Sequence, residues 1–229
     1  MAAALALGEP VARILLLREG AGEDARALAV RARRAGIPVR EASAGDLRRL
    51  SLEGPPAPIL ALVGRDPDAS AEAVFSWPGA KWLLVGAAYP GNVGAALRTI
   101  EVTGADAAFV DAPLDHAGRR AALRTSMNVE RFLPVHWRPA DAVLTLAQAA
   151  GHRVFGIEDV GRVAPWEVDL LAPALFLVGG EDQSLAPALL ERCHQVLRIP
   201  MRGFVPCYNL QAAVAVVAVE RLRQASRRV

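Results

Sequence analysis

The sequence predicts an α/β protein in which a parallel sheet holds a ligand at its strand ends and a smaller α/β module precedes that sheet. Apolar runs of strand length alternate with amphipathic stretches of helix length along most of the 229 residues. Glycine and proline separate these stretches. In residues 174–223, two loops each follow a strand. Small ligands bind at such strand ends in open α/β sheets, because unpaired backbone groups converge there.

Length and composition limit the number of domains and the location of the protein. The 229 residues are 53% hydrophobic, which is enough apolar chain for one large or two small domains. The longest apolar run, 210–219, contains Gln211 and is rich in alanine and valine, which predicts a packed helix rather than a membrane span. The chain starts without a basic leader, and its two distant cysteines fit a reducing compartment. We therefore expect a cytoplasmic protein with no membrane segment.

The charged residues favour an RNA partner only weakly. A net charge of +2 is too small to indicate nucleic-acid binding by itself. Lys81 is the only lysine, so arginine supplies the other 25 of the 26 basic side chains. Residues 1–65 contain 10 arginines against 7 aspartates and glutamates, an excess compatible with an RNA-facing surface. The histidines and cysteines lack metal-ligand spacing, so no metal site is expected.

In the first part of the chain, strand and helix signals alternate in the order strand, helix, strand, helix, strand. This order predicts a small α/β module. The expected elements span residues 12–17, 23–35, 38–41, 46–50 and 59–63, with Asp46 as the N-cap of the second helix. The first helix carries four arginines on its outer face, which is a solvated face in the simplest interpretation: Arg26, Arg31, Arg33 and Arg34.

Residues 64–78 are polar and contain Pro67 and Pro78, which predicts a linker. The expected domains are therefore 1–75 and 76–229. The second domain repeats the alternation of strands and helices and is expected to form the parallel sheet. Its strands are expected at 81–86, in a run ending at Asp111, at 132–135, at 153–157, at 174–178, and in a run ending at Met201. Its helices are expected at 92–104 with Asn92 as the N-cap, in the basic segment 119–131, at 140–150, and from about Asn209.

Candidate functional residues fall in four short segments. These are Asn92-x-Gly94-x-x-x-Arg98, Gly179-Gly180-Glu181, Ile199-Pro200-Met201 and Cys207-Tyr208-Asn209. Each also has a purely structural interpretation. Arg98 has Glu101 three residues on as a surface partner, the paired glycines suit a tight turn, and Asn209 suits a helix N-cap. Glu181 is equally well explained as a solvated acid in a turn.

Together and in this order, the four segments resemble the motifs of the SpoU/TrmH family of S-adenosylmethionine-dependent RNA ribose methyltransferases, in the SPOUT superfamily. The resemblance covers residues 80–223 well and residues 1–75 loosely. It implies a SPOUT-like parallel sheet with a trefoil knot, preceded by a small L30e-like RNA-binding domain. It also implies a homodimer whose interface lies beside the cofactor site, and methyl transfer from S-adenosylmethionine to a ribose 2′-hydroxyl of tRNA or rRNA.

The resemblance assigns roles to particular residues. As catalytic residues it implies Arg98, Asn92, Glu181 and Asn209. As cofactor-binding residues it implies Gly179, Gly180, Ile199, Met201, Cys207, Tyr208 and Asn209. The sequence departs from the family pattern at Ser184, where glycine is usual, and at Cys207, where serine is usual. It departs again at Pro55-Pro56-Ala57-Pro58, where many members read His-Gln-Gly.

Arg98 is an unsuitable general base, because the pKa of a guanidinium lies far above 7 and removing its proton at pH 7 would cost roughly 9 kcal/mol. We expect it instead to hold an RNA phosphate and polarise the 2′-hydroxyl, with a phosphate or a water molecule taking the proton. Two other functions fit the sequence. One is an RNA-binding protein of this fold with little catalysis, which Ser184 and Cys207 would explain. The other is a methyltransferase acting on a small molecule. The sequence does not specify which RNA and which nucleotide are modified.

Overall fold

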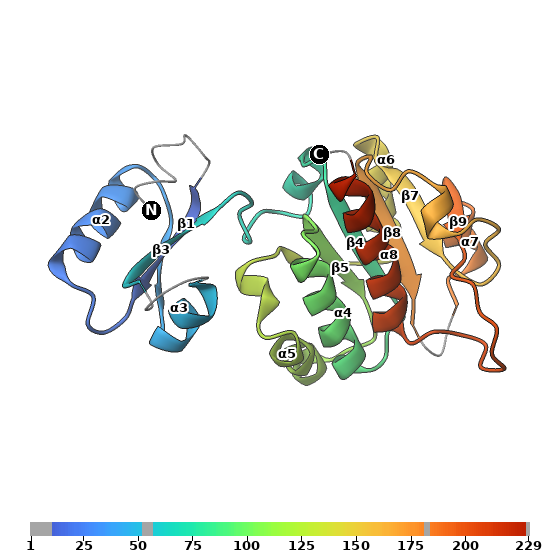
Figure 1. The fold of residues 1–229 in the computed structure, drawn as a ribbon, viewed down its shortest axis with the longest axis horizontal. Helices are drawn as coiled ribbons and strands as arrows, with labels where there is room; N and C mark the ends of the chain where they lie inside the picture. The colour runs from blue at the N-terminus through green and yellow to red at the C-terminus, as the bar shows by residue number, and fades with distance from the viewer. Residues whose placement is uncertain (1–10, 52–56, 181–183, 228–229) are drawn as a thin grey trace. The chain divides into compact units, whose positions relative to one another are not determined.

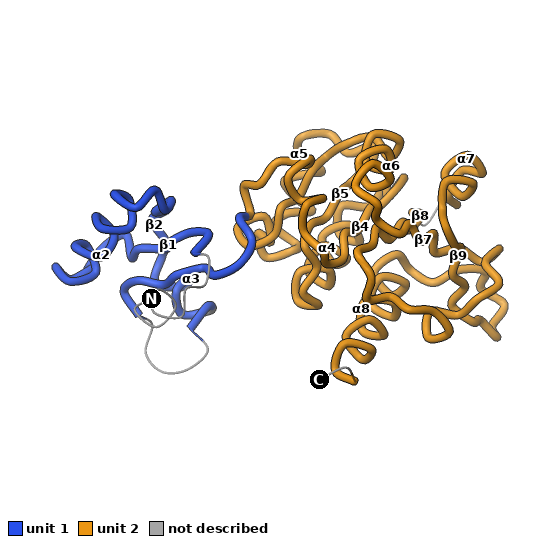
Figure 2. The backbone as a smooth tube through the Cα atoms, turned by 90° about the horizontal axis from the view of Figure 1, so that it is seen from above, with its two compact units in different colours: residues 1–66 blue, residues 67–229 orange. Residues whose placement is uncertain are grey.

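The structure is a computed structural model that describes residues 11–51, 57–180 and 184–227 (Figure 1). The chain divides into two compact units, residues 1–66 and 67–229 (Figure 2). This division precedes the expected boundary at residue 75, because Ala71, Val74 and Phe75 are buried in the core of the second unit. Part of the expected linker is therefore part of that core.

The first unit contains a three-stranded sheet and two helices. Its elements are β1 (Val11–Leu17), α2 (Glu23–Arg34), β2 (Val39–Ala42), α3 (Ala44–Leu50) and β3 (Ile59–Val63). The strand order is β2-β1-β3, with β2 parallel and β3 antiparallel to β1. The predicted alternation is confirmed for this unit. Helix α2 buries Ala25, Ala29 and Ala32 and exposes its four arginines, as its amphipathic pattern indicates.

The N-cap of α3 is Ser43, so the prediction that Asp46 caps this helix was wrong. The Ser43 hydroxyl accepts a hydrogen bond from the Asp46 N–H at 3.1 Å, and the Asp46 carboxylate accepts one from the Ser43 hydroxyl at 2.8 Å. Both residues belong to one capping box, in which the acid occupies the third helical position rather than the cap.

The second unit is built on a six-stranded parallel sheet with the order β6-β5-β4-β8-β7-β9. Its strands are β4 (Ala80–Val85), β5 (Ala107–Asp111), β6 (Val135–Trp137), β7 (Arg153–Ile157), β8 (Ala174–Gly179) and β9 (Gln195–Leu197). Its helices are α4 (Pro90–Val102), α5 (His116–Thr125), α6 (Ala140–Ala149), α7 (Pro187–Leu190) and α8 (Leu210–Ser226). Short 3-10 turns occupy Ala73–Ser76, Val129–Arg131 and Pro165–Glu167. The predicted parallel sheet is confirmed.

One strand of this sheet lies later than predicted. The strand expected at 132–135 is found at Val135–Trp137, because the preceding residues continue a 3-10 turn. The N–H groups of Phe132 and Leu133 both bond to the Val129 carbonyl, at 2.9 and 3.0 Å. An apolar run of this length does not by itself distinguish a buried turn from a strand.

Alternate residues of the central strands face two separate cores. Trp82 and Leu84 of β4 pack with α4 and α8, whereas Leu83 packs on the opposite face with α6. On the first face, Phe176 of β8 stacks between Trp82 and Phe155, with ring centroids 4.9 and 5.3 Å away. Helices α4 and α8 lie side by side over this face (Figure 1). Helices cover both faces of the sheet. A ligand site can therefore form only where the strands end.

Candidate active site

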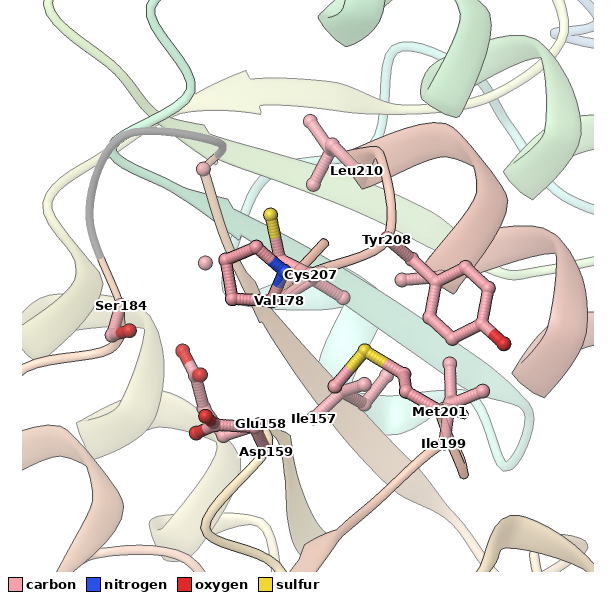
Figure 3. A pocket seen from close by; sticks show the side chains of 14 residues that line it. Ile157, Glu158, Asp159, Val178, Ser184, Ile199, Met201, Cys207, Tyr208 and Leu210 are labelled. Carbon is pink, nitrogen blue, oxygen red and sulfur yellow. The ribbon is translucent and has the colours of Figure 1, made fainter. Parts of the chain in front are cut away.

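A cavity of about 260 Å³ lies where the carboxyl ends of β7, β8 and β9 meet the start of α8 (Figure 3). The carboxyl ends of parallel strands share one edge of the sheet, which brings loops together that are far apart in the sequence. The lining residues are Ile157, Glu158, Asp159, Val178, Gly179, Gly180, Ser184, Ile199, Met201, Pro206, Cys207, Tyr208, Leu210 and Ala213.

The structure brings together in this cavity six residues that the sequence predicts for cofactor binding. They are Gly179, Gly180, Ile199, Met201, Cys207 and Tyr208. Ser184 also lines the cavity, so the two departures from the family motifs at Ser184 and Cys207 both belong to the site. Glu181 lies outside the described residues.

Gly180 is required by a close approach of two backbone segments. A Cβ atom at this position would lie 2.6 Å from the Gly86 carbonyl oxygen and 2.9 Å from the Ala87 Cα. The Gly180 N–H donates to the Val85 carbonyl at 2.7 Å. The cavity wall after β8 is therefore packed directly against the loop that leads from β4 into α4. This contact gives Gly180 a role beyond a tight turn.

The start of α8 is held by two local hydrogen bonds. The Tyr208 hydroxyl donates to the Pro200 carbonyl at 3.0 Å, which closes the loop between β9 and α8. The Asn209 side chain accepts from the Gln211 N–H at 2.9 Å, so Asn209 is the N-cap, as predicted. Asn209 is exposed and is not among the residues that line the cavity.

Two acidic residues of the cavity were not singled out from the sequence. Glu158 and Asp159 directly follow β7, whose carboxyl end lies at the same edge of the sheet as those of β8 and β9. Burial raises the pKa of the Glu158 carboxyl group, although its hydrogen bond from the Leu185 N–H opposes the shift. The signal that would have found them is their position immediately after a predicted strand.

The segment that contains Asn92, Gly94 and Arg98 forms the first half of α4. Asn92 is not the N-cap as predicted, since Tyr89 occupies that position and Pro90 begins the helix. Proline suits the first helical position because its missing N–H has no partner there in any case. A Cβ atom on Gly94 would lie 2.4 Å from the Ala122 carbonyl oxygen, so this glycine allows α5 to pack closely on α4.

Arg98 is exposed and does not line the cavity of its own chain. Its guanidinium makes no hydrogen bond or ion pair with any residue that the structure describes, and the surface pair with Glu101 is not formed. Glu101 is half-buried, and burial raises the pKa of its carboxyl group. The guanidinium of Arg98 is therefore free to bind an anion.

In residues 11–51, 57–180 and 184–227, no group of three or more histidine, cysteine, aspartate or glutamate side chains is arranged to hold a metal ion. Within the same ranges, no helix has both the length and the apolar composition that a membrane span requires.

The fold and the cavity define an α/β protein with a cavity at the carboxyl edge of a parallel sheet. Residues 81–219 match the SpoU rRNA Methylase family, and the chain belongs to this family. The 23S rRNA (guanosine-2'-O-)-methyltransferase RlmB of Pseudomonas syringae pv. tomato is 31% identical over 150 residues. That match covers 63% of this chain and 58% of the relative, so the chain spans little more than half of the relative's length.

Solved structures share the fold over nearly the whole chain. A crystal structure of an RNA 2'-O ribose methyltransferase is 26% identical, with a TM-score of 0.59, and the match covers 97% of this chain and 84% of that one. The SpoU methyltransferase AviRb of Streptomyces viridochromogenes, solved in complex with AdoMet, has a TM-score of 0.62 at 23% identity. The match covers 99% of this chain and 87% of that structure.

Proposed function

We propose that this protein transfers a methyl group from S-adenosylmethionine to a ribose 2′-hydroxyl in tRNA or rRNA. The observation that carries the proposal is the meeting of Gly179, Ile199 and Tyr208, which are distant in the sequence, in the wall of one cavity. A relative named as a 23S rRNA 2'-O-methyltransferase and membership of the SpoU family support the same reaction class.

The residues of the cavity fit S-adenosylmethionine. Ile157, Val178 and Ile199 offer apolar surface for an adenine ring. The cavity volume of about 260 Å³ lies just below the range of about 300–1,000 Å³ typical of small-molecule sites. Glu158 and Asp159 supply carboxylates for the ribose hydroxyls and the positive sulfonium. When bound, the cofactor supplies an electrophilic methyl group. The residues of the chain hold it in position and limit its contact with water.

Arg98 acts on the RNA rather than on the cofactor in this proposal. Its free guanidinium binds a phosphate next to the target ribose and donates a hydrogen bond to the 2′-oxygen, which stabilises the alkoxide that develops as the 2′-hydroxyl loses its proton and attacks the methyl group. The RNA phosphate or a water molecule takes the proton. Asn92, Glu181 and Asn209 remain predicted contributors that position the ribose and the loops around it.

We further propose that two copies of the chain pair through α4 and α8. The two helices pack together and are joined by a hydrogen bond from Gln211 to Thr99 at 3.3 Å. They expose Val102, Val219 and Leu222, which are 66%, 57% and 42% accessible and would be covered by a second copy. Arg98 lies one helical turn before Val102 on the same face of α4. Pairing would therefore place Arg98 at the interface, and we propose that it serves the cavity of the other copy.

Complementation between two inactive variants tests this arrangement. Arg98→Ala removes the guanidinium, and Cys207→Trp fills the cavity at an exposed position. If Arg98 serves the other copy's cavity, mixed dimers contain one intact site, and random mixing restores roughly a quarter of the wild-type activity. If each chain supplies its own Arg98, mixing restores no activity. Sedimentation of the wild type, and of Val219→Glu with Leu222→Glu, measures the pairing itself.

For the first unit we propose binding of the RNA substrate. Helix α2 exposes its four arginines on one face, and this supports an electrostatic contact with phosphates. Reversing two of these charges in the full chain, Arg31→Glu with Arg34→Glu, should weaken RNA binding and reduce its salt dependence. The L30e-like character of this unit and the trefoil knot in the second unit stay predictions.

The decisive experiment has two parts. Calorimetry measures S-adenosylmethionine binding to the purified chain, and mass spectrometry compares ribose methylation of tRNA and rRNA in cells with and without the gene. Binding together with the loss of one methylated nucleotide supports the proposal and identifies the target. No cofactor binding would favour an RNA-binding protein, and binding without any change in RNA would favour a small-molecule methyltransferase.

A further inference from the structure

The loop between β9 and α8 exposes apolar side chains beside the cavity. Met201 and Pro206 line the cavity, whereas all the residues between them are exposed. Phe204 is fully exposed and Val205 is 72% exposed. In Figure 1 this orange-red segment extends beyond the body of the second unit. The phenyl ring and the neighbouring valine are not packed in the fold of this chain, so both are available to contact another molecule.

Positive charge accompanies this aromatic residue. Arg202 lies two residues before Phe204, and Arg198 follows β9 at the same edge of the sheet. Arg162 belongs to a neighbouring segment. The Arg198 N–H joins the two segments by donating to the Val163 carbonyl at 2.8 Å. All three guanidinium groups are exposed, and none forms an ion pair or hydrogen bond with another described residue. The carboxylates of this region, Glu158 and Asp159, line the cavity itself.

We propose that this loop binds a single-stranded segment of the RNA substrate next to the target nucleotide. Phe204 stacks on an unpaired base and Arg202 contacts a phosphate; the proposal rests on the function proposed above. Unpaired bases are recognised by stacking on aromatic rings, and arginine provides both phosphate contacts and stacking. A methyl donor in the cavity requires the target ribose at the cavity mouth, and the neighbouring nucleotides then reach the loop. Single-stranded RNA supplies both features at once, since each nucleotide carries a base that can stack and a phosphate that can pair with a guanidinium.

The test measures methyl transfer to RNA purified from cells that lack the gene. Phe204→Ala should raise the KM for RNA roughly tenfold, from the loss of one stacked base, with kcat nearly unchanged. The Kd for S-adenosylmethionine should not change. Phe204→Tyr should restore the KM, whereas Phe204→Leu, which is apolar but not aromatic, should not. Arg202→Gln should weaken RNA binding and lower the salt dependence of KM.

Trp166→Ala is the matched control, because Trp166 is an exposed aromatic side chain elsewhere in the second unit. A wild-type KM in Phe204→Ala would overturn the proposal. Weaker cofactor binding in that variant would identify the loop as a cover for the cavity and would also overturn it. Dissociation of a dimer, seen by sedimentation, would identify a protein contact instead. If the wild type methylates no RNA, the function proposed above fails, and filter binding of the same RNA to wild type and Phe204→Ala still decides whether the loop binds RNA.

Discussion

The six-stranded sheet has an amino edge, where its strands begin, and a carboxyl edge, where they end. Polar side chains are buried at the amino edge and accessible at the carboxyl edge. At the amino edge, Lys81, Asp106 and His152 are all almost completely buried and lie against one another. The Lys81 ammonium lies 3.0 Å from an Asp106 carboxylate oxygen and 3.0 Å from the His152 Nε2, and it also donates to the carbonyls of Trp77 and Gly79. At the carboxyl edge, an open cavity exposes carboxylates and backbone groups to ligands.

The difference separates groups that stabilise the fold from groups available for binding. A buried charge is tolerated only when its partners replace water, and the amino edge supplies those partners around one compact ammonium. The only lysine of the chain is therefore enclosed by the fold and is not available to bind a ligand. Apart from histidine, every exposed basic side chain is consequently an arginine, and arginine suits phosphate recognition because of its planar fork of donors.

Breaking the amino edge should have the largest effect on stability. Lys81→Met leaves the buried Asp106 carboxylate without its cation and should lower the free energy of unfolding by about 3–5 kcal/mol. Urea denaturation measures the loss. Arg138→Met removes the cation of an exposed pair with Glu72, 3.7 Å apart, and should change stability little. Equal losses in the two variants would show that the amino edge is no more important than the surface.

At the carboxyl edge, the largest effect should be on catalysis. Arg98→Ala should lower kcat by about 10²–10³ while leaving cofactor affinity unchanged, because the guanidinium stabilises charge only on the reacting RNA. Arg192→Ala, which removes a guanidinium just before β9 at the amino edge, is the control for the change in net charge. A similar loss of kcat in both variants would argue against a specific role for Arg98.

A backbone change at the cavity should affect both stability and binding. Gly180→Ala places a methyl group against the Gly86 carbonyl and should cost about 1–3 kcal/mol, with weaker cofactor binding because the wall after β8 must move. Gly91→Ala meets no atom within 4 Å and should be neutral or slightly stabilising. Unfolding and calorimetry of the two variants separate close packing from a general effect of losing a glycine.

As the pH falls, the buried polar cluster at the amino edge should lose stability before the carboxyl edge does. Burial, and then the positive charge of Lys81, lower the pKa of His152, so the folded state keeps this ring neutral. Stability is therefore full above the unfolded pKa of about 6.5 and declines as the pH falls below it, by at most roughly 1.4 kcal/mol per pH unit for one proton. His136, whose pKa burial also lowers, adds a slope of the same sign. Denaturation at pH 5–8 should show a smaller slope in His152→Gln, and an unchanged slope would contradict this account.

The smallest expected effect is a difference between the two cysteines in their rate of alkylation. Burial raises the pKa of the Cys193 thiol to about 11, so only about 0.1% is thiolate at pH 8. Cys207 is exposed in the cavity wall. Iodoacetamide should therefore modify Cys207 first, and S-adenosylhomocysteine should slow that reaction. Peptide mass spectrometry measures both rates. Preferential labelling of Cys193, or no protection of Cys207, would contradict the proposed site.

The sequence predicted which loops line the cavity better than it predicted the structure around Asn92 and Arg98. The turn after β8 was found because glycines mark the strand end locally, whereas β9 ends at Leu197 and not at Met201 as predicted. The acidic wall of Glu158 and Asp159 was missed, since its importance depends on β7 lying between β8 and β9. Asn92 was assigned to a cap because its side chain suits one, but Pro90 starts the helix earlier.

The sequence by itself determined the alternation of strands and helices, the parallel sheet, and the loops at which a ligand would bind. These follow from apolar periodicity and turn residues, which act over a few neighbouring positions. Only the tertiary structure decided that Gly180 packs against Gly86, that Lys81 is enclosed, and that Arg98 lies outside the cavity of its own chain. Those features depend on β8 lying between β4 and β7, and pairing between strands so distant in the sequence leaves no local pattern.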